Sequence, residues 1–275
     1  ISPWNYPIML CLNPLIAAIS SGNTAIIKPS ELTPASGELL KKLIEKTFPT
    51  NEVAVFLGEK DVAQKLLDLP FNHIMFTGSP QVGKLVMAAA SKHLAGLTLE
   101  LGGKSPVIVD KHANIEDAAW KISFYKFANA GQTCTAPDYI LCDEAVHDNL
   151  VSALQKNMLG FFSEGIDAAK KDYCSIANEH HFNRLQDALQ SSVSAGSNIA
   201  CGGETSQSGL YLSPAVLIDV SYENPIMQEE IFGPILPVVK VKNLEESIDY
   251  VNKNEKPLAL YLFSNKSFVH EKVLQ

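Results

Sequence analysis

The sequence lacks the surplus of positive charge that nucleic-acid-binding proteins carry. Its 275 residues include 22 Lys plus Arg against 30 Asp plus Glu, which gives a formal net charge of −8. A protein that binds nucleic acid meets the phosphates with a basic face, so this balance argues against nucleic acid as a partner. A small anionic ligand stays open, because the N-terminus of a single helix can hold one.

No hydrophobic run is long enough to cross a bilayer. The stretch from Ile8 to Ile19 is the longest, and it contains Asn13 and Pro14, whereas a spanning helix needs roughly 20 apolar residues. We therefore expect no integral membrane segment in this chain. The first residue is Ile1 rather than Met, and no basic segment precedes an apolar one. We expect from this that the chain is a piece of a larger protein.

Cysteine is scarce, odd in number and irregularly spaced. The five cysteines stand at positions 11, 134, 142, 174 and 201, without a C-x-x-C pair. This pattern argues against a disulfide framework and favours a reducing compartment, so we expect a cytoplasmic protein. None of the seven histidines stands in a zinc-binding motif, and we expect no metal site.

The composition predicts a folded α/β protein. Hydrophobic residues make up 46% and charged residues 19% of the chain, which is enough to bury a core, and the length fits one large or two modest domains. Apolar runs typical of strands alternate with helical periodicity in the first part of the chain. The strands are expected at 24–28, 53–57, 73–77 and 97–101, and the helices at 39–44, 62–69 and 82–89. Such alternation predicts parallel strands joined by crossover helices.

A second α/β pattern follows. Its strands are expected at 106–109, 236–241 and 258–263, and its helices at 114–130, 145–161 and 178–195. The Gly102–Gly103 pair is the most plausible hinge. We therefore divide the chain into a first domain over residues 1–102 and a second over residues 103–275.

The turn after the third strand is a candidate phosphate site. In the run from Phe76 to Gly83, Gly78 permits a tight turn, Ser79 can cap the next helix and Pro80 suits its first position. The exposed N–H groups of such a helix start suit a phosphate or pyrophosphate. The G-x-G-x-x-G fingerprint is absent, so an ordinary strand-to-helix turn is an equal alternative.

Lys28 and Glu31 follow the first strand, beyond the carboxyl edge where open α/β sheets bind ligands. An acidic residue there can accept hydrogen bonds from ribose hydroxyls. The alternative is a solvated pair in a loop.

Cys134 and Glu100 are the candidate reactive pair. Cys134 follows Gly131-Gln132-Thr133, where we expect a helix to end at Gly131 and irregular backbone to expose a thiolate. A nucleophilic cysteine needs a base to remove a proton or activate water. Glu100 interrupts an apolar strand beside Gly102, where desolvation would raise its pKa towards that of a general base. The alternative for Glu100 is an outward-facing strand residue.

Six short motifs follow one another along the chain. They are Pro3-Trp4-Asn5-Tyr6-Pro7, Lys28-Pro29-Ser30-Glu31, Phe76-Thr77-Gly78-Ser79, Leu99-Glu100-Leu101-Gly102-Gly103-Lys104, Gly131-Gln132-Thr133-Cys134 and Glu229-Glu230-Ile231-Phe232-Gly233-Pro234. In this order they resemble the aldehyde dehydrogenase superfamily, and the ordered set is far more specific than any single motif. The run from Lys126 to Pro137 resembles the branch that acts on fatty and aromatic aldehydes.

The resemblance implies a Rossmann-like coenzyme-binding domain followed by an α/β catalytic domain, each lacking one end. It also implies catalytic roles. Cys134 is similar to the nucleophile that attacks the aldehyde carbon, and Asn5 resembles the oxyanion donor that acts with the Cys134 backbone N–H. Glu100 resembles the base that activates water to hydrolyse the thioester.

The resemblance further implies a nicotinamide cofactor, NAD or NADP, and a set of residues that bind it. Lys28 and Glu31 resemble the contacts to the adenosine ribose, and Glu31 would repel a 2′-phosphate. The residues that resemble those near the pyrophosphate are Trp4, Gly78, Ser79 and Gly83. Glu230 resembles the residue that binds the nicotinamide ribose, and Phe232 resembles the residue that packs near the nicotinamide ring. We also expect an aldehyde substrate and a homodimer or homotetramer.

Three other functions stay open from the sequence. An acylating relative would pass the thioester to coenzyme A or phosphate, but Glu100 favours hydrolysis. A catalytically silent fragment or binding homologue is consistent with the missing ends and disfavoured by the intact set of Asn5, Glu100 and Cys134. A cysteine hydrolase would need a histidine partner for Cys134, and no histidine motif stands near it.

Overall fold

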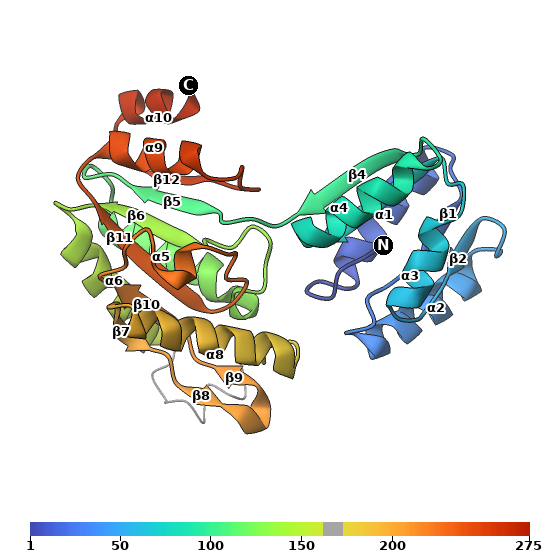
Figure 1. The fold of residues 1–275 in the computed structure, drawn as a ribbon, viewed down its shortest axis with the longest axis horizontal. Coiled ribbons are helices and arrows are strands. Elements are labelled where there is room, and N and C mark those ends of the chain that lie inside the picture. Colours follow the sequence, from blue (N-terminus) through green and yellow to red (C-terminus); the bar gives the residue numbers. More distant parts are fainter. Residues whose placement is uncertain (162–172) are drawn as a thin grey trace. The chain divides into compact units, whose positions relative to one another are not determined.

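The computed structural model describes residues 1–161 and 173–275. The chain divides into two compact units, Ile1–Gly102 and Gly103–Gln275 (Figure 1). Each unit combines helices with mostly parallel strands, which confirms the α/β fold class.

The first unit alternates helices and strands. Its elements are α1 (Met9–Ser20), β1 (Ala25–Ile27), α2 (Pro34–Thr47), β2 (Val53–Val55), α3 (Lys60–Leu67), β3 (His73–Gly78), α4 (Pro80–Ser91) and β4 (Gly96–Leu101). β1 pairs with β2 and β3 pairs with β4, both in parallel. The four expected strands and three expected helices are thereby confirmed. Parallel neighbours need a crossover, and α2 and α4 provide it.

Residues 1 and 2 join the two strand pairs of this unit. The N–H of Ile1 donates to the carbonyl of Met75 at 2.9 Å, and the N–H of Thr77 donates to the carbonyl of Ile1 at 3.2 Å. The N–H of Ser2 donates to the carbonyl of Lys28 at 3.0 Å. The carboxyl ends of β1 and β3 therefore lie on either side of residues 1 and 2.

The second unit is built on a six-stranded sheet. Its strands are β5 (Pro106–Val109), β6 (Tyr139–Asp143), β7 (Asn198–Gly202), β10 (Ala215–Ile218), β11 (Ile235–Val241) and β12 (Tyr261–Phe263), with a separate short pair formed by β8 (Thr205–Ser206) and β9 (Tyr211–Leu212). The order across the sheet is β12-β5-β6-β11-β10-β7, and all neighbours are parallel except β10 and β7. The expected strands 106–109, 236–241 and 258–263 are confirmed.

Helices cover both faces of this sheet. They are α5 (Ile115–Phe127), α6 (His147–Phe161), α8 (Glu179–Ser194), α9 (Leu244–Lys253) and α10 (Ser267–Leu274), with 3₁₀ turns at Ala128–Gly131, Gln207–Gly209 and Pro225–Met227. Successive strand residues take opposite faces. Val107 and Ile140 pack with α5 and α6, while Ile108 and Leu141 pack with α8. The sheet thus forms the middle of three layers.

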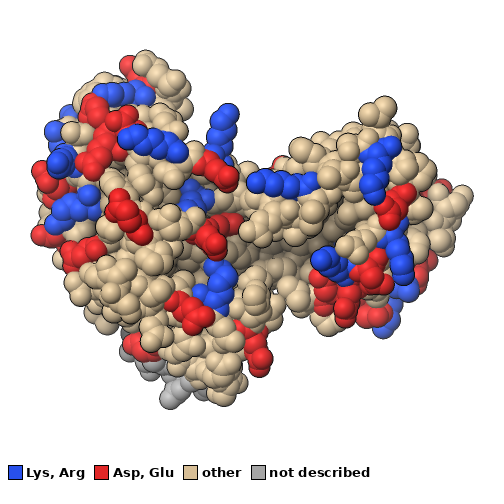
Figure 2. All heavy atoms as spheres, viewed as in Figure 1, with Lys and Arg blue, Asp and Glu red and all other residues tan. Residues whose placement is uncertain are grey.

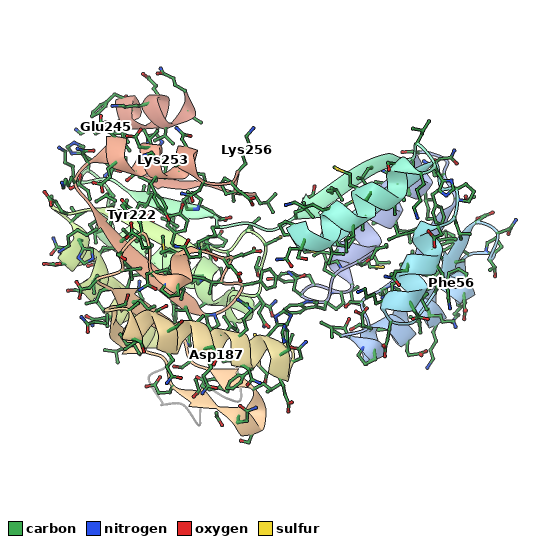
Figure 3. The ribbon with its side chains drawn as sticks, viewed as in Figure 1. Phe56, Asp187, Tyr222, Glu245, Lys253 and Lys256 are labelled. Carbon is green, nitrogen blue, oxygen red and sulfur yellow. The ribbon has the colours of Figure 1, made fainter. Side chains whose placement is uncertain are left out.

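The outer helices α9 and α10 are linked by charge. Lys272 of α10 forms an ion pair with Glu245 at the start of α9. Tyr222, which is labelled in Figure 3, stacks on Tyr250 of α9, with ring centroids 4.2 Å apart. These contacts fix α9 beside the sheet.

The surface seen in Figure 2 carries basic and acidic side chains interspersed with one another. Among the described residues, no helix is both long enough and apolar enough to cross a membrane.

Candidate functional site

The segment before Cys134 has an unusual backbone. α5 ends at Phe127, earlier than the expected end at Gly131, because Asn129 and Ala130 both have φ of 52° and Gly131 has φ of 69°. Left-handed backbone at a residue other than glycine costs roughly 1–3 kcal/mol and collects at functional sites. Cys134 follows in a turn and is half-buried, so the expected irregular backbone at Cys134 is confirmed.

Gln132 fixes this segment from within. Its buried amide donates to the carbonyls of Asn129 at 3.1 Å and Ser175 at 3.2 Å, and accepts from the N–H of Ala177 at 2.9 Å. A buried amide with its donors and acceptor used holds its neighbours in one arrangement. Gln132 is therefore a positioning residue. This role was not predicted from the sequence, although Gln132 stands inside the Gly131–Cys134 motif.

An aromatic side chain contacts the turn that contains Cys134, and others are exposed on α5. The hydroxyl of Tyr261 in β12 donates to the carbonyl of Thr135 at 2.5 Å. Burial raises the pKa of Tyr261, and the side chains of Tyr125 and Cys134 raise it further. Tyr261 thus contacts the residue that directly follows Cys134. On α5, Trp120 and Phe124 stack at 5.5 Å between ring centroids and are about half exposed.

The other cysteines differ from Cys134. Cys11 and Cys142 are buried, as expected for small hydrophobic residues. Burial raises the pKa of Cys142 to about 12 and that of Cys201 to about 11, so both keep their protons at neutral pH. All five cysteines lie in the described residues, and none of them forms a disulfide there.

Glu230 and Phe232 lie in the loop between β10 and β11. Phe232 has φ of 46°, a strained conformation for an aromatic residue. Burial raises the pKa of Glu230 to about 7, opposed by a backbone hydrogen bond from Gly103 and by the charge of Lys104. The carboxylate therefore titrates near neutral pH, with the ionised form favoured above it.

The loop of Glu230 contacts the Cys134 segment through glycines. A Cβ built on Gly131 would lie 2.3 Å from the carbonyl oxygen of Gly233, which is backbone and cannot move aside. The close approach of these two loops requires glycine at position 131. Within the second unit, the structure thus brings the segments of Cys134, Glu230 and Phe232 together.

Charged side chains surround the same loop. Lys126 is fully buried, and burial lowers its pKa to about 8, while the nearby charges of Asp138 and Glu230 raise it. Arg184 donates to the carbonyl of Ile231 at 2.6 Å. With Glu230 and Ile231, Arg184 lines a cavity of about 240 Å³ beside the loop.

In the first unit, three of the expected site residues stand at one edge of the strands. Lys28 directly follows β1, Ser79 directly follows β3 and Glu100 lies near the end of β4. Because the carboxyl ends of β1 and β3 flank residues 1 and 2, and β3 pairs with β4 in register, these three residues share the carboxyl edge. Trp4 and Asn5 follow residues 1 and 2 in the chain.

Lys28 and Glu31 form a close ion pair. The Nζ of Lys28 lies 2.6 Å from Oε2 of Glu31, with the Lys28 side chain buried and that of Glu31 43% exposed. Partial burial raises the pKa of Glu31, but the hydrogen bond from Lys28, a backbone hydrogen bond and the charge of Lys28 together outweigh it, and the pKa falls below its ordinary value. Glu31 is therefore ionised at neutral pH and neutralises Lys28.

The turn after β3 is capped as the sequence predicts. The hydroxyl of Ser79 accepts from the N–H of Val82 at 3.4 Å, and Pro80 opens α4. The reason for Gly78 differs from the expected tight turn: Gly78 ends β3, and a Cβ there would lie 2.5 Å from the Phe76 ring. A Cβ on Gly83 would lie 2.9 Å from the Leu101 side chain, so this glycine lets α4 approach β4.

Glu100 is not desolvated. It lies in β4 opposite Thr77 of β3 and is exposed, so the expected burial of its carboxylate is wrong. Alternation along the strand leaves Glu100 on the more open face, because its neighbours Leu99 and Leu101 take the face packed in the unit's core.

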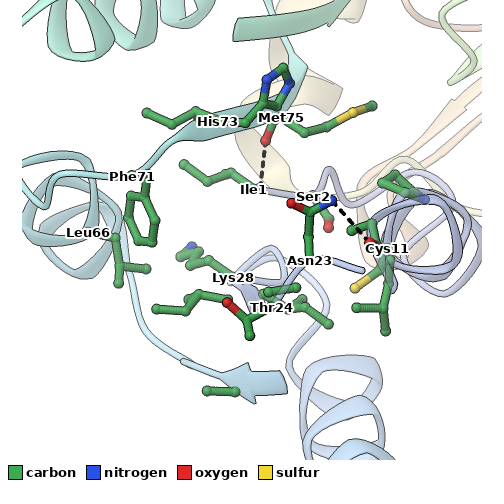
Figure 4. A pocket seen from close by; sticks show the side chains of 18 of the residues that line it. Ile1, Ser2, Cys11, Asn23, Thr24, Lys28, Leu66, Phe71, His73 and Met75 are labelled. Carbon is green, nitrogen blue, oxygen red and sulfur yellow. Dashed lines mark hydrogen bonds between the residues drawn. The ribbon is translucent and has the colours of Figure 1, made fainter. Parts of the chain in front are cut away.

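A cavity of about 850 Å³ in the first unit is lined by residues of α1, β1 and β3, including Cys11, Thr24 and His73 (Figure 4). Of the expected site residues, Lys28 also lines it. Ile1, which donates to the carbonyl of Met75, is another lining residue. No group of three or more His, Cys, Asp or Glu in residues 1–161 and 173–275 is arranged to hold a metal ion.

Comparison with known proteins identifies the family. The family model described as "Aldehyde dehydrogenase family" matches residues 1–275. The chain is 48% identical over 274 residues to a 4,4'-diaponeurosporen-aldehyde dehydrogenase of Staphylococcus aureus, which covers 100% of this chain and 59% of that protein. It is 44% identical over 274 residues to a dimeric NADP-preferring aldehyde dehydrogenase of Rattus norvegicus, again covering 100% of this chain and 59% of the relative. The chain belongs to the aldehyde dehydrogenase family.

Solved structures agree. A substrate-bound state of Staphylococcus aureus AldH matches with a TM-score of 0.95 and 47% identity, covering 99% of this chain and 59% of that one. The lactaldehyde dehydrogenase from Escherichia coli matches with a TM-score of 0.91 and 33% identity, covering 99% and 58%. The chain thus spans about 59% of the length of the curated relatives named above.

Proposed function

We propose that the protein is an NAD(P)-dependent aldehyde dehydrogenase that converts an aldehyde into a carboxylic acid. The observation that carries the proposal is the half-buried Cys134, set in a turn behind three left-handed residues and held by Gln132. A thiol on such a fixed, accessible turn suits nucleophilic attack. Family membership supports the same reaction class.

The chemistry follows from the roles of this chain's own side chains. The Cys134 thiolate attacks the aldehyde carbon, and the Asn5 side chain and the Cys134 N–H donate to the oxygen as it gains negative charge. After oxidation, the acyl group remains on Cys134 as a thioester. Glu100 then takes a proton from water, the hydroxide attacks the acyl carbon, and the acid leaves as the thiol is regenerated. The exposure of Glu100 is consistent with access to water.

A nicotinamide dinucleotide fits the described residues. The Ser79-capped start of α4 offers N–H groups to a pyrophosphate, and the Lys28–Glu31 pair stands at the carboxyl edge where a ribose would lie. Glu230, with Phe232 two residues on, suits the hydroxyls of a second ribose. When bound, the nicotinamide supplies the hydride acceptor.

An apolar aldehyde is the proposed substrate. The support is the exposed aromatic face of Trp120, Phe124 and Tyr125 on α5, with Tyr261 contacting the residue that directly follows Cys134. Aromatic faces bind apolar groups at little cost in side-chain entropy. We propose, as for the relative named dimeric, that the whole protein forms an oligomer, and that it acts in the cytoplasm.

Product analysis tests this function. The protein is mixed with a long-chain or aromatic aldehyde and NAD or NADP, and the products are measured with and without coenzyme A. We expect free carboxylic acid and one reduced cofactor per aldehyde in both cases. A product that appears only with coenzyme A would show an acylating enzyme, and no reduction with any aldehyde of the panel would contradict the proposal.

The Lys28–Glu31 pair predicts cofactor preference. We expect Glu31→Gln to shift the kcat/KM ratio towards NADP, because it removes a charge that repels the 2′-phosphate and frees Lys28 from its ion pair. The Glu31 side chain is 43% exposed, so solvent screens its charge. An interaction of about 1 kcal/mol would shift the ratio up to roughly fivefold. Glu38→Gln, an exposed change on α2, is the control. An unchanged ratio would argue against Glu31 at the ribose.

A further inference from the structure

We propose that Lys104 and Asp138 are positioning residues that hold the Glu230–Phe232 loop in a fixed place against the Cys134 segment. Neither has a role in the mechanism above. The inference rests on the proposed function, because the loop matters for catalysis only if Glu230 and Phe232 meet the cofactor.

Lys104 uses its ammonium group as a three-way anchor. Its Nζ donates to Oδ2 of Asp138 at 2.5 Å and to the carbonyls of Ile226 at 2.9 Å and Glu229 at 2.7 Å. An ammonium has three N–H donors, and these three acceptors match them. Two of the acceptors are backbone atoms on the loop that leads into Glu230, so Lys104 fixes the path of the chain there.

Asp138 holds the next part of the same loop. While Oδ2 binds Lys104, Oδ1 accepts from the N–H of Ile231 at 2.9 Å. Its own N–H donates to the carbonyl of Ser105 at 2.8 Å, beside Lys104. The carboxylate thus joins Lys104 and the loop by separate oxygens, and the residues on both sides of Glu230 are anchored.

The position of Asp138 in the chain links the two functional segments. Asp138 lies four residues after Cys134, directly before β6. Gly131, three residues before Cys134, is in close contact with the carbonyl of Gly233 just past Phe232. The Cys134 segment therefore contacts the loop on both sides of the cysteine. After the cysteine, the contact is made by Asp138 of the charged pair, and before it, by the backbone at Gly131 and Gly233.

The pair is built for position rather than for net stability. The side chain of Asp138 is 4% exposed and that of Lys104 is 18% exposed. A buried ion pair repays its desolvation only with good geometry and further hydrogen bonds, and its best attested use is to specify one arrangement. Here the further hydrogen bonds of the two side chains go to backbone atoms of Ile226, Glu229 and Ile231, which lead into or follow Glu230. A displaced loop would misplace Glu230 and Phe232 while leaving Cys134 able to react.

Measuring two activities distinguishes a displaced cofactor loop from general damage to the fold. Aldehyde oxidation needs the cofactor. Hydrolysis of p-nitrophenyl acetate needs no cofactor, and therefore neither Glu230 nor Phe232: the Cys134 thiolate displaces p-nitrophenolate, and water activated by Glu100 then releases acetate and restores the thiol. The experiment compares both activities in the whole protein carrying Lys104→Met with Asp138→Asn, a double change that leaves neither member of this pair as an unpaired charge. Lys104→Gln is the second variant, in case the double variant folds poorly.

We expect the KM for the cofactor to rise at least tenfold and kcat for oxidation to fall at least tenfold, while ester hydrolysis stays within about twofold of the unmodified protein. The matched control is Lys121→Met with Asp117→Asn, which removes an exposed ion pair on α5. Unchanged cofactor kinetics, or a parallel loss of both activities, would overturn the proposal. Cys134→Ala should lose both activities; if it keeps them, the proposed function itself fails, whatever the Lys104 variants do.

Discussion

Cys134→Ala is expected to abolish aldehyde oxidation. Without the thiol, no covalent adduct can form, and removal of a covalent nucleophile lowers turnover by a factor on the order of 10⁶. The fold should be unaffected, because Cys134 is half-buried in a turn and alanine fits there. The measurement is the rate of NADH or NADPH formation, with circular dichroism to show that the variant is folded.

The other thiols provide the controls for this result. Cys142→Ala and Cys201→Ala remove cysteines whose raised pKa values keep them protonated, so both variants should oxidise aldehyde at the rate of the unmodified protein. Turnover retained by Cys134→Ala and lost in Cys142→Ala would reverse the assignment of the nucleophile.

The regular alternation of the chain made much of the fold predictable. All four strands of the first unit and the helices after β1, β2 and β3 follow from apolar runs separated by helical periodicity. α1 was not predicted, because Pro14 lies inside it and an interior proline costs about 3 kcal/mol. Packing outweighs this cost: Cys11 and Leu15 of α1 join a core with Ile27 and Leu40.

Strands in the middle of the second sheet were harder to predict. β6 is buried at every position, so it shows no alternation between apolar and polar residues. A continuous apolar run of this kind does not distinguish a strand from a helix. β7 and β10 were missed as well, and their antiparallel pairing was outside the all-parallel expectation.

The residues of the site also fall into a group that the sequence indicated and a group that it did not. Cys134 and Glu100 were indicated by the chemistry of their own segments, whereas Glu230 was indicated only by the resemblance to the family. The residues that hold these segments were not predictable, because their partners are far apart in the sequence. Lys104 reaches Glu229 across 125 residues and Tyr261 reaches Thr135 across 126. Only folding brings such pairs together.

The exposure of Glu100 does not by itself decide between its two interpretations. An outward-facing carboxylate on β4 is what a purely structural role predicts, and a base that takes a proton from water must also be able to reach water. Burial cannot separate these roles, so kinetics must. The step at which the reaction stalls is the discriminating observation.

We expect Glu100→Gln to stall the reaction after the thioester has formed. General-base catalysis contributes roughly 10²–10⁴-fold, so steady-state turnover should fall by a factor in that range. Hydride transfer precedes the blocked step, and rapid mixing should therefore show a burst of reduced cofactor near one equivalent per active site. A structural role predicts neither effect, since an exposed carboxylate replaced by its amide costs little.

The control is Glu52→Gln, an exposed change in the same unit, which should give neither a burst nor slower turnover. Near-normal turnover without a burst in Glu100→Gln would remove Glu100 from the mechanism. Loss of the burst together with turnover would instead place Glu100 at the activation of the Cys134 thiol, because the reaction would then stop before hydride transfer. Each of the three patterns corresponds to one role, since the burst counts thioesters formed and the steady state counts thioesters hydrolysed.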